Sequence, residues 1–261
     1  MNFRKGISLV VAIVIVTTIF AQDRLFTYAY QSTVLNKGQH ELEVYNTLRT
    51  GKIDYFSRLD NRTEIEIGLG NNLQTSFYLN LTSITQPVSS ALTTEHELSF
   101  SNEWKYKLAD PVADPVGLAV YGEYTIGTTE YELEGKLIAD KKLGKFDIAA
   151  NATYEYEAET FANNVWEKEG KADLNLSLAY ELNPHFHLTF ENSFQNVFAD
   201  GELKHSALYS GLGISYVKEK FWINFTVMPQ IQSFKGTTIN STLNLDEFEK
   251  LQCRLLFSVV I

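Results

Sequence analysis

The sequence predicts an all-β protein: a transmembrane up-and-down antiparallel β-barrel of about twelve strands, preceded by a signal peptide. Three observations support this prediction. The chain begins with a short apolar segment, apolar and polar residues alternate with period two over the remainder, and the links between the alternating segments contain turn-forming residues. Period two is the periodicity of a strand, whereas a helix repeats every 3.6 residues.

Residues 1–21 have the features of a secretory signal peptide. Arg4 and Lys5 are followed by an apolar stretch from Ile7 to Phe20, and Ala21 precedes the expected cleavage point. The stretch is short for a membrane-spanning helix, which needs about 20 apolar residues, so an uncleaved anchor is the alternative. We therefore divide the chain into a signal peptide (1–21), a periplasmic N-terminal segment (22–38) and an outer-membrane barrel (39–261).

The alternating segments come in order along the chain, and four show a clean separation of two faces. The segments that separate cleanly are 56–69, 130–142, 168–182 and 248–261; in the first, Leu59, Ile65 and Ile67 lie opposite Glu64 and Glu66. The predicted strands cover residues 40–50, 56–69, 73–82, 95–108, 117–126, 130–142, 145–157, 168–182, 185–197, 206–217, 221–232 and 248–261.

The links are expected to alternate in length. Gly, Asn and Pro mark tight turns at 70–72, 143–144 and 183–184, and the link at 218–220 is equally short. Longer links rich in Ser, Thr and Asn are expected at 83–94, 158–167, 198–205 and 233–247. Short turns at one end and longer loops at the other are typical of membrane barrels, and an even strand number places both termini in the periplasm.

Aromatic residues favour an apolar face that points outward to lipid. On that face they gather near the two ends of the strands, as in the aromatic girdles of membrane barrels. A barrel of twelve strands is also too wide for side chains to fill an apolar interior. The predicted girdle residues are Tyr106, Phe146, Tyr180, Phe186, Tyr216 and Phe221 near the short turns, and Tyr124, Tyr131, Tyr154 and Tyr156 near the longer links.

Composition excludes several classes of protein. The net charge of −10 opposes nucleic-acid binding, because the phosphate backbone favours a basic surface. The single cysteine, Cys253, excludes a disulfide framework. The mean hydropathy of −0.15 suggests a soluble protein, but this average cancels an apolar row against a charged row. We expect no cofactor, no metal and no catalytic residue.

The barrel pattern resembles that of bacterial outer-membrane β-barrel proteins. The segment from Leu251 to Ile261 resembles the C-terminal strand that barrel-assembly machinery recognises, although it ends in Ile261 where an aromatic residue is usual. The stretches 34–43 and 64–74 are similar to transporter-like outer-membrane proteins linked to phenol-degradation pathways. This resemblance implies a porin-like or transporter-like role.

The charged face is predicted to line the barrel lumen. Because acidic residues predominate there, the sequence predicts passage of small polar or cationic solutes. Charges on the first two strands are expected to pair as a ladder of ion pairs. The predicted lumen-lining residues are Glu41, Glu43, Arg49, Arg58, Asp60, Arg62, Glu64, Glu66, Glu97, Glu103, Glu123, Glu132 and Glu134.

Two alternatives remain open at this point. One is a closed structural or surface-adhesion barrel, and the other is an outer-membrane lipid-modifying enzyme. Enzymes of the second kind need a Ser–His pair within hydrogen-bond reach. Neighbours such as His205 and Ser206 point to opposite faces of a strand, so such a pair would have to join two strands. The expected partners are outer-membrane lipid, the assembly machinery and a small polar solute.

Overall fold

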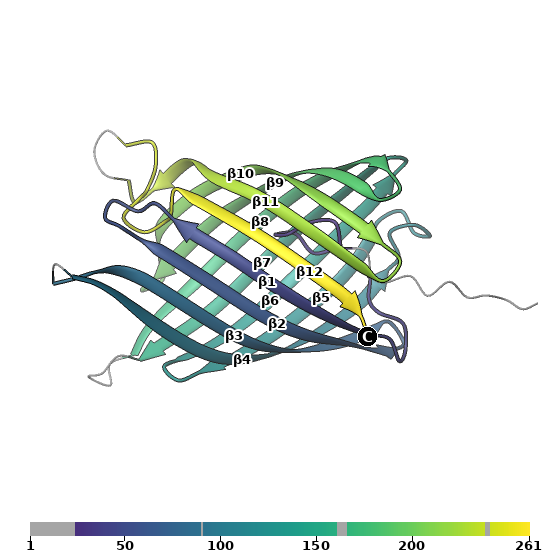
Figure 1. Ribbon diagram of the computed structural model, residues 1–261, viewed down its shortest axis with the longest axis horizontal. Coiled ribbons are helices and arrows are strands. Elements are labelled where there is room, and N and C mark those ends of the chain that lie inside the picture. The colour runs from purple at the N-terminus through teal and green to yellow at the C-terminus, as the bar shows by residue number, and fades with distance from the viewer. Residues whose placement is uncertain (1–23, 90, 161–165, 238–240) are drawn as a thin grey trace, which may run out of the picture.

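The strands close into a single barrel. The computed structural model describes residues 24–89, 91–160, 166–237 and 241–261, so the predicted signal peptide lies outside the described residues. Each strand pairs antiparallel with its neighbours in the sequence, and β1 pairs with β12 to close the barrel (Figure 1). The predicted class, an all-β closed barrel of twelve antiparallel strands, is confirmed. In the described part of the chain, no helix has the length and apolarity needed to cross a membrane.

All twelve predicted segments form strands. Their bounds are β1 His40–Thr50, β2 Ser57–Gly70, β3 Leu73–Val88, β4 Ala91–Ala109, β5 Gly117–Gly127, β6 Glu130–Leu143, β7 Phe146–Thr160, β8 Trp166–Asn183, β9 Phe186–Ala199, β10 Glu202–Lys218, β11 Phe221–Lys235 and β12 Leu251–Val260. The links after β2, β4, β6, β8 and β10 lie at the end of the barrel where β1 begins and β12 finishes, which we call the terminal end. The opposite end carries the links 51–56 and 236–250 and is called the loop end.

Two of the longer links predicted from the sequence are wrong. Strands β3 and β4 run through most of 83–94, where Thr85 and Thr94 hydrogen-bond across the ladder at 2.9 Å. Threonine is β-branched and suits a strand, so its abundance there does not indicate a loop. Between β9 and β10, Asp200 and Gly201 both have positive φ (55° and 76°) and form a two-residue hairpin turn, so the predicted link 198–205 is also mostly strand.

The β4–β5 link is held by an aspartate turn. The Asp110 carboxylate accepts hydrogen bonds from the backbone amides of Val112 and Ala113 at 3.0 and 3.1 Å, and Lys107 Nζ donates to it at 3.0 Å. The Val112 amide, together with Lys107 and Ala113, lowers the pKa of Asp110 to about 2. This carboxylate therefore keeps the turn closed down to strongly acidic pH.

The outer face of the barrel is apolar and carries aromatic residues towards both ends. Leu79, Leu133 and Leu174 are exposed there, with 56%, 61% and 56% of their surface accessible. Near the terminal end, Phe146 contacts Tyr180 at 5.0 Å and Phe186 contacts Tyr216 at 4.8 Å (ring centroids). Near the loop end, Tyr131 stacks on Trp166 at 5.7 Å. Of the predicted girdle residues, Tyr216 and Phe221 are half-buried against each other and the remainder are exposed: Tyr106, Tyr124, Tyr131, Phe146, Tyr154, Tyr156, Tyr180 and Phe186.

A substitution at Leu174 tests whether the apolar face points outward to lipid. We expect Leu174→Arg to lower the free energy of unfolding by about 2–4 kcal/mol, because it places a charge on the lipid-facing surface. Asn175→Arg is the matched control, since Asn175 is the next residue on β8 and lines the interior. Denaturant unfolding in lipid vesicles, followed by tryptophan fluorescence, measures both. Equal destabilisation by the two variants would contradict this assignment of faces.

Candidate functional site

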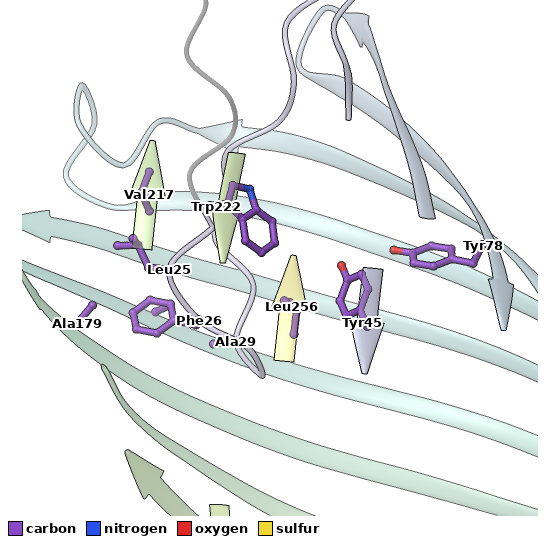
Figure 2. Close-up of a cluster of buried hydrophobic side chains, with 10 residues drawn as sticks. Leu25, Phe26, Ala29, Tyr45, Tyr78, Ala179, Val217, Trp222 and Leu256 are labelled. Atoms are coloured by element: carbon purple, nitrogen blue, oxygen red, sulfur yellow. The ribbon is translucent and has the colours of Figure 1, made fainter. Parts of the chain in front are cut away.

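An irregular segment of the chain fills part of the barrel interior. Residues 24–36 belong to the predicted N-terminal segment (22–38) and lie inside the barrel, and we call them the lumenal segment (Figure 1). Phe26, Thr27 and Ala29 are completely buried. Apolar side chains of the segment pack with residues from the wall, among them Trp222 and Leu256 (Figure 2).

One carboxylate of the wall holds the centre of the lumenal segment. Glu191, on β9, accepts hydrogen bonds from the backbone amides of Thr27 and Tyr28 at 3.0 and 2.8 Å, and Ala29 N lies at 3.4 Å. The hydroxyl groups of Thr27 and Thr226 donate to the same carboxylate. A buried backbone amide without a hydrogen-bond partner costs free energy. Glu191 therefore supplies the acceptor that a neighbouring strand would supply in a sheet.

Side chains from three other strands hold the rest of the segment. Asn151 on β7 pairs in both directions with the backbone of Tyr30, at 2.6 and 3.0 Å. Asp140 accepts from Ser32 N at 3.2 Å, and Gln74 accepts from Leu35 N at 2.8 Å. Gly68 has no side chain, and a Cβ atom there would collide with the backbone oxygens of residues 35 and 36. The wall is therefore shaped to receive the segment.

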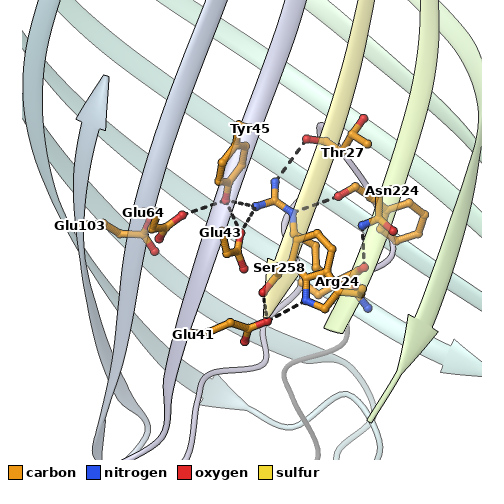
Figure 3. Close-up of polar contacts among 12 residues, drawn as sticks. Arg24, Thr27, Glu41, Glu43, Tyr45, Glu64, Glu103, Asn224 and Ser258 are labelled. Atoms are coloured by element: carbon orange, nitrogen blue, oxygen red, sulfur yellow. Dashed lines mark hydrogen bonds and ion pairs between the residues drawn. The ribbon is translucent and has the colours of Figure 1, made fainter. Parts of the chain in front are cut away.

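Arg24 joins the start of the segment to a group of acidic residues. Its guanidinium donates a hydrogen bond to Tyr45 Oη at 2.7 Å and lies 3.9 Å from a Glu43 carboxylate oxygen (Figure 3). The single hydroxyl proton of Tyr45 is shared between Glu43, at 2.7 Å, and Glu64, at 2.9 Å. Asn224 donates to the backbone oxygen of Arg24 at 2.7 Å.

Two tyrosines of the segment lie against cations. The guanidinium of Arg24 and the ammonium of Lys136 each lie 4.0 Å from the ring centroid of Tyr30, and Arg254 lies 4.1 Å from that of Tyr28. Aromatic rings attract cations, and the attraction is strongest where water is excluded. These contacts add to the hydrogen bonds that hold the segment.

The lumenal segment separates two cavities. The cavity towards the loop end, which we call the vestibule, has a volume of about 560 Å³ and ends on Tyr28 and Tyr30. The cavity towards the terminal end has a similar volume of about 560 Å³ and is lined by Leu25, Gln31 and Leu35 of the segment. Because the segment lines both cavities, it stands between the two ends of the barrel.

One side of the vestibule is strongly acidic. Across β6, β7 and β8 the register places Glu132 beside Glu157 and Glu157 beside Glu169, and Glu130 lies opposite Glu159. Like charges directly opposite each other destabilise a sheet. Lys171 forms ion pairs in this array, with Glu155 at 2.9 Å and with Glu157. We call these residues of β6–β8 the acidic wall.

The predicted lumen residues lie at two depths. Those that line the vestibule are Arg49, Arg58, Asp60, Arg62, Glu97, Glu123, Glu132 and Glu134. The others are completely or almost completely buried beside the lumenal segment: Glu41, Glu43, Glu64, Glu66 and Glu103.

The predicted ladder of ion pairs between β1 and β2 is wrong. The register places like charges opposite each other: Glu41 with Glu66, Glu43 with Glu64, and Arg49 with Arg58. The ion pairs run diagonally or to other strands. Arg49 and Arg58 share Asp60 at 3.2 and 2.7 Å, and Arg62 reaches Glu123 on β5 at 2.6 Å.

Several residues that matter here were not predicted from the sequence. Glu191, Asn151 and Gln74 have the parity of inward-facing residues, but nothing in the sequence near them shows that residues 24–36 bind there. A second unpredicted contact joins two strands near the loop end, where Ser83 Oγ lies 2.9 Å from His96 Nδ1. Because the two residues lie on different strands, no pattern within one strand of the sequence indicates this pair.

The geometry defines the class of protein: a closed up-and-down barrel with an apolar exterior and a charged interior, as in outer-membrane channels. The chain belongs to a family described as a family of unknown function (DUF6662), whose model matches residues 18–260. Comparison with curated proteins found no match.

Solved structures of outer-membrane barrels have a similar fold. An outer-membrane channel from Pseudomonas putida F1 matches with a TM-score of 0.64 and 12% identity, covering 88% of this chain and 98% of that chain. The NanC porin matches with a TM-score of 0.56 and 10% identity, covering 84% and 98%. The translocator domain of the autotransporter NalP from Neisseria meningitidis has a TM-score of 0.60 and 10% identity, covering 85% and 87%. At these identities, the likeness concerns the fold alone.

Glu191 tests how the lumenal segment is held. Glu191→Gln replaces one acceptor oxygen by an amide donor that faces the donors of the segment. Hydrogen bonds to a charged group contribute about 1.5–3 kcal/mol, so we expect backbone amides at 25–31 to exchange at least about tenfold faster with deuterium. Glu169→Gln, on the acidic wall, should leave their exchange unchanged. Unaltered exchange in Glu191→Gln would contradict this account.

Proposed function

We propose that this protein is an outer-membrane channel that passes small polar or cationic solutes through an acidic lumen, and that the lumenal segment closes the channel at rest. The observation on which this proposal rests is the position of the segment, which stands between the acidic vestibule and the cavity at the terminal end. The vestibule, at about 560 Å³, has room for a small solute.

The charge of the vestibule supports a preference for cations. Acidic side chains that line a pore attract cations and repel anions. The KdgM porin, which has a similar fold (TM-score 0.54, 8% identity), has been solved in complex with disordered oligogalacturonate, a solute that carries carboxylates. The acidic wall of this chain would repel such a solute, so we propose a different solute class for this channel.

The way in which the segment is held supports a closure that can open. Its backbone pairs with side chains of the wall and adds no strand to the sheet. Side-chain contacts break without disturbing the strand ladder, so the segment can leave while the barrel stays intact.

The proposal also assigns a location and a direction. We propose that residues 1–21 direct secretion, that the terminal end faces the periplasm and that β12 engages the assembly machinery. The two ends of the barrel sheet meet there, where Ile261 N donates to His40 O at 3.1 Å. Short turns on the periplasmic side are the rule in bacterial barrels.

Removal of the lumenal segment tests the closure. We expect the mature protein to show little current in planar bilayers, and a variant lacking residues 24–36 to show steady openings of larger conductance, because the two cavities become continuous. The Glu191→Gln variant, which keeps the whole lumenal segment, should show channel openings more often than the wild type. Silence in all three, each inserted and resistant to SDS before heating, would favour the closed structural or surface-adhesion barrel.

Charge reversal tests the selectivity. Glu132→Lys together with Glu157→Lys should reduce the cation-to-anion permeability ratio several-fold, since the two reversals remove most of the net negative charge of the acidic wall. Reversal potentials in a KCl gradient measure this ratio, with the deletion variant as background. Glu219→Lys, in the link between β10 and β11, is the matched control and should leave the ratio unchanged. An equal change in both would show that the acidic wall does not select.

A second candidate function is favoured by one observation. Ser83 and His96 form a cross-strand hydrogen bond, and His96 is exposed on the outer face near the loop end. A histidine within reach of a serine hydroxyl is the minimum for a serine nucleophile, and lipid acyl esters would lie on this face. Hydrolysis of phospholipid by the wild type, lost in Ser83→Ala and in His96→Ala, would support a lipid-modifying enzyme; no hydrolysis would exclude it.

A further inference from the structure

Three buried carboxylates converge on the inner wall beside the lumenal segment. Glu64 and Glu66 lie on β2 and Glu103 on β4, and one oxygen from each lies within 4.8 Å of the others. All three are at most 4% exposed. Glu64 and Glu103 lie on the side of the barrel where Arg24 and Tyr45 meet (Figure 3).

Each of these carboxylates keeps an oxygen without a hydrogen bond. Tyr45 donates to Glu64 Oε2 and Tyr78 donates to Glu103 Oε2, whereas Glu64 Oε1 and Glu103 Oε1 are buried without a donor among the described residues. Glu66 Oε2 is buried in the same way. The two tyrosines therefore orient two carboxylates and leave one oxygen of each available, as hydrogen-bond donors beside metal ligands commonly do.

A buried hydroxyl lies in the same row. The register places Ser76 on β3 directly between Glu66 on β2 and Glu103 on β4. Its side chain is completely buried and lies close to the Glu64 carboxylate, but its Oγ has no hydrogen bond of regular geometry to the described residues. A buried polar group without a partner costs free energy. This hydroxyl is therefore an independent sign that the oxygen atoms of this site bind a ligand.

The local charges do not balance. Lys105, completely buried on β4, interacts electrostatically with Glu66 and Glu103. The other nearby cations are engaged elsewhere, since Arg24 lies beside Glu43 and Arg62 pairs with Glu123. Glu64, Glu66 and Glu103 against the one ammonium of Lys105 leave a formal excess of two negative charges, and Glu41 and Glu43, which are grouped with Glu66, add to it, so the site favours a divalent cation.

We propose that Glu64, Glu66 and Glu103, with the hydroxyl of Ser76, bind one Ca²⁺ ion. The ligands are all hard oxygen donors, which Ca²⁺ accepts, and carboxylates supply the charge. Two oxygens that bind the same ion at about 2.4 Å lie at most about 4.8 Å apart, and the oxygens of this group lie within that limit of one another. Mg²⁺ demands near-ideal octahedral geometry and gives up its water reluctantly, so a buried group of protein oxygens suits Ca²⁺ better.

The site bears on the lumenal segment through Tyr45. Glu64 and Glu43 share the hydroxyl proton of Tyr45, and Arg24 donates to the oxygen of Tyr45. A cation on Glu64 draws off negative charge there and leaves the tyrosine proton to Glu43, which lies beside Arg24. Bound Ca²⁺ therefore fixes the hydrogen bonds at the start of the segment.

Terbium luminescence measures the site directly. Tb³⁺ occupies Ca²⁺ sites and emits when a nearby tyrosine is excited, and Tyr45 and Tyr78 are hydrogen-bonded to two ligands. The full mature protein, refolded in detergent and treated with EDTA, should show saturable emission that Ca²⁺ displaces at least about tenfold more effectively than Mg²⁺ at equal ionic strength. Glu66→Gln and Glu103→Gln should each weaken binding at least about tenfold.

Controls separate the site from general acidity and from folding. Glu169→Gln, on the acidic wall, should bind as the wild type does. Folding of each variant is checked by its resistance to SDS before heating, and Ser76→Ala, which keeps every carboxylate, gives a second test if a glutamate variant does not fold. In the folded wild type, Ca²⁺ should also raise the denaturation temperature.

The proposal is overturned if the folded wild type shows no saturable emission, which would mean that the carboxylates hold protons instead of a metal. It is also overturned if Glu66→Gln binds as tightly as Glu169→Gln, or if Mg²⁺ displaces Tb³⁺ as well as Ca²⁺ does. No current is measured in these experiments, so their outcome is independent of whether the barrel conducts.

Discussion

Backbone hydrogen bonding is the constraint on which the structure depends. A barrel in a bilayer needs a partner for every amide of its wall, and pairing of β1 with β12 closes the ladder so that no edge remains. The lumenal segment has no strand to pair with, yet it is buried. Its amides are satisfied by side chains that point inward from the wall, chiefly Glu191, Asn151 and Gln74. The polar face of the strands therefore serves as the binding surface for the chain's own N-terminal region.

Because the lumenal segment fills part of the barrel, the charged residues of the interior lie in two different environments. Charges that face a water-filled pore need no partner, whereas those beside the lumenal segment are removed from water and must be compensated. Beside the segment, Arg24 compensates Glu43, and in the vestibule Arg62 pairs with Glu123. In the vestibule, the acidic wall keeps an excess of carboxylates that its lysines do not balance. The interior thus has a buried part that supports structure and a part that lines the vestibule.

The fold alone leaves the activity open, since channels and an autotransporter translocator domain share it. The features of this chain that bear on function are in its interior: the lumenal segment, the acidic wall and the carboxylates of β2 and β4. All of these are side-chain features on a common backbone. In barrels that share this backbone, the side chains of the inner face therefore determine the function.

The sequence by itself determined the strands and their faces, because period-two alternation is a local property and each of the twelve segments shows it independently of the others. It also placed Glu64 and Leu174 on opposite faces for the same reason. Only the tertiary structure decided which residues meet across strands. Register set Glu43 opposite Glu64 instead of an arginine, and a hairpin turn at Asp200 lengthened β10. The place of residues 24–36 depends on partners more than a hundred residues away, such as Asn151 and Glu191, and such contacts leave no periodic trace in the sequence.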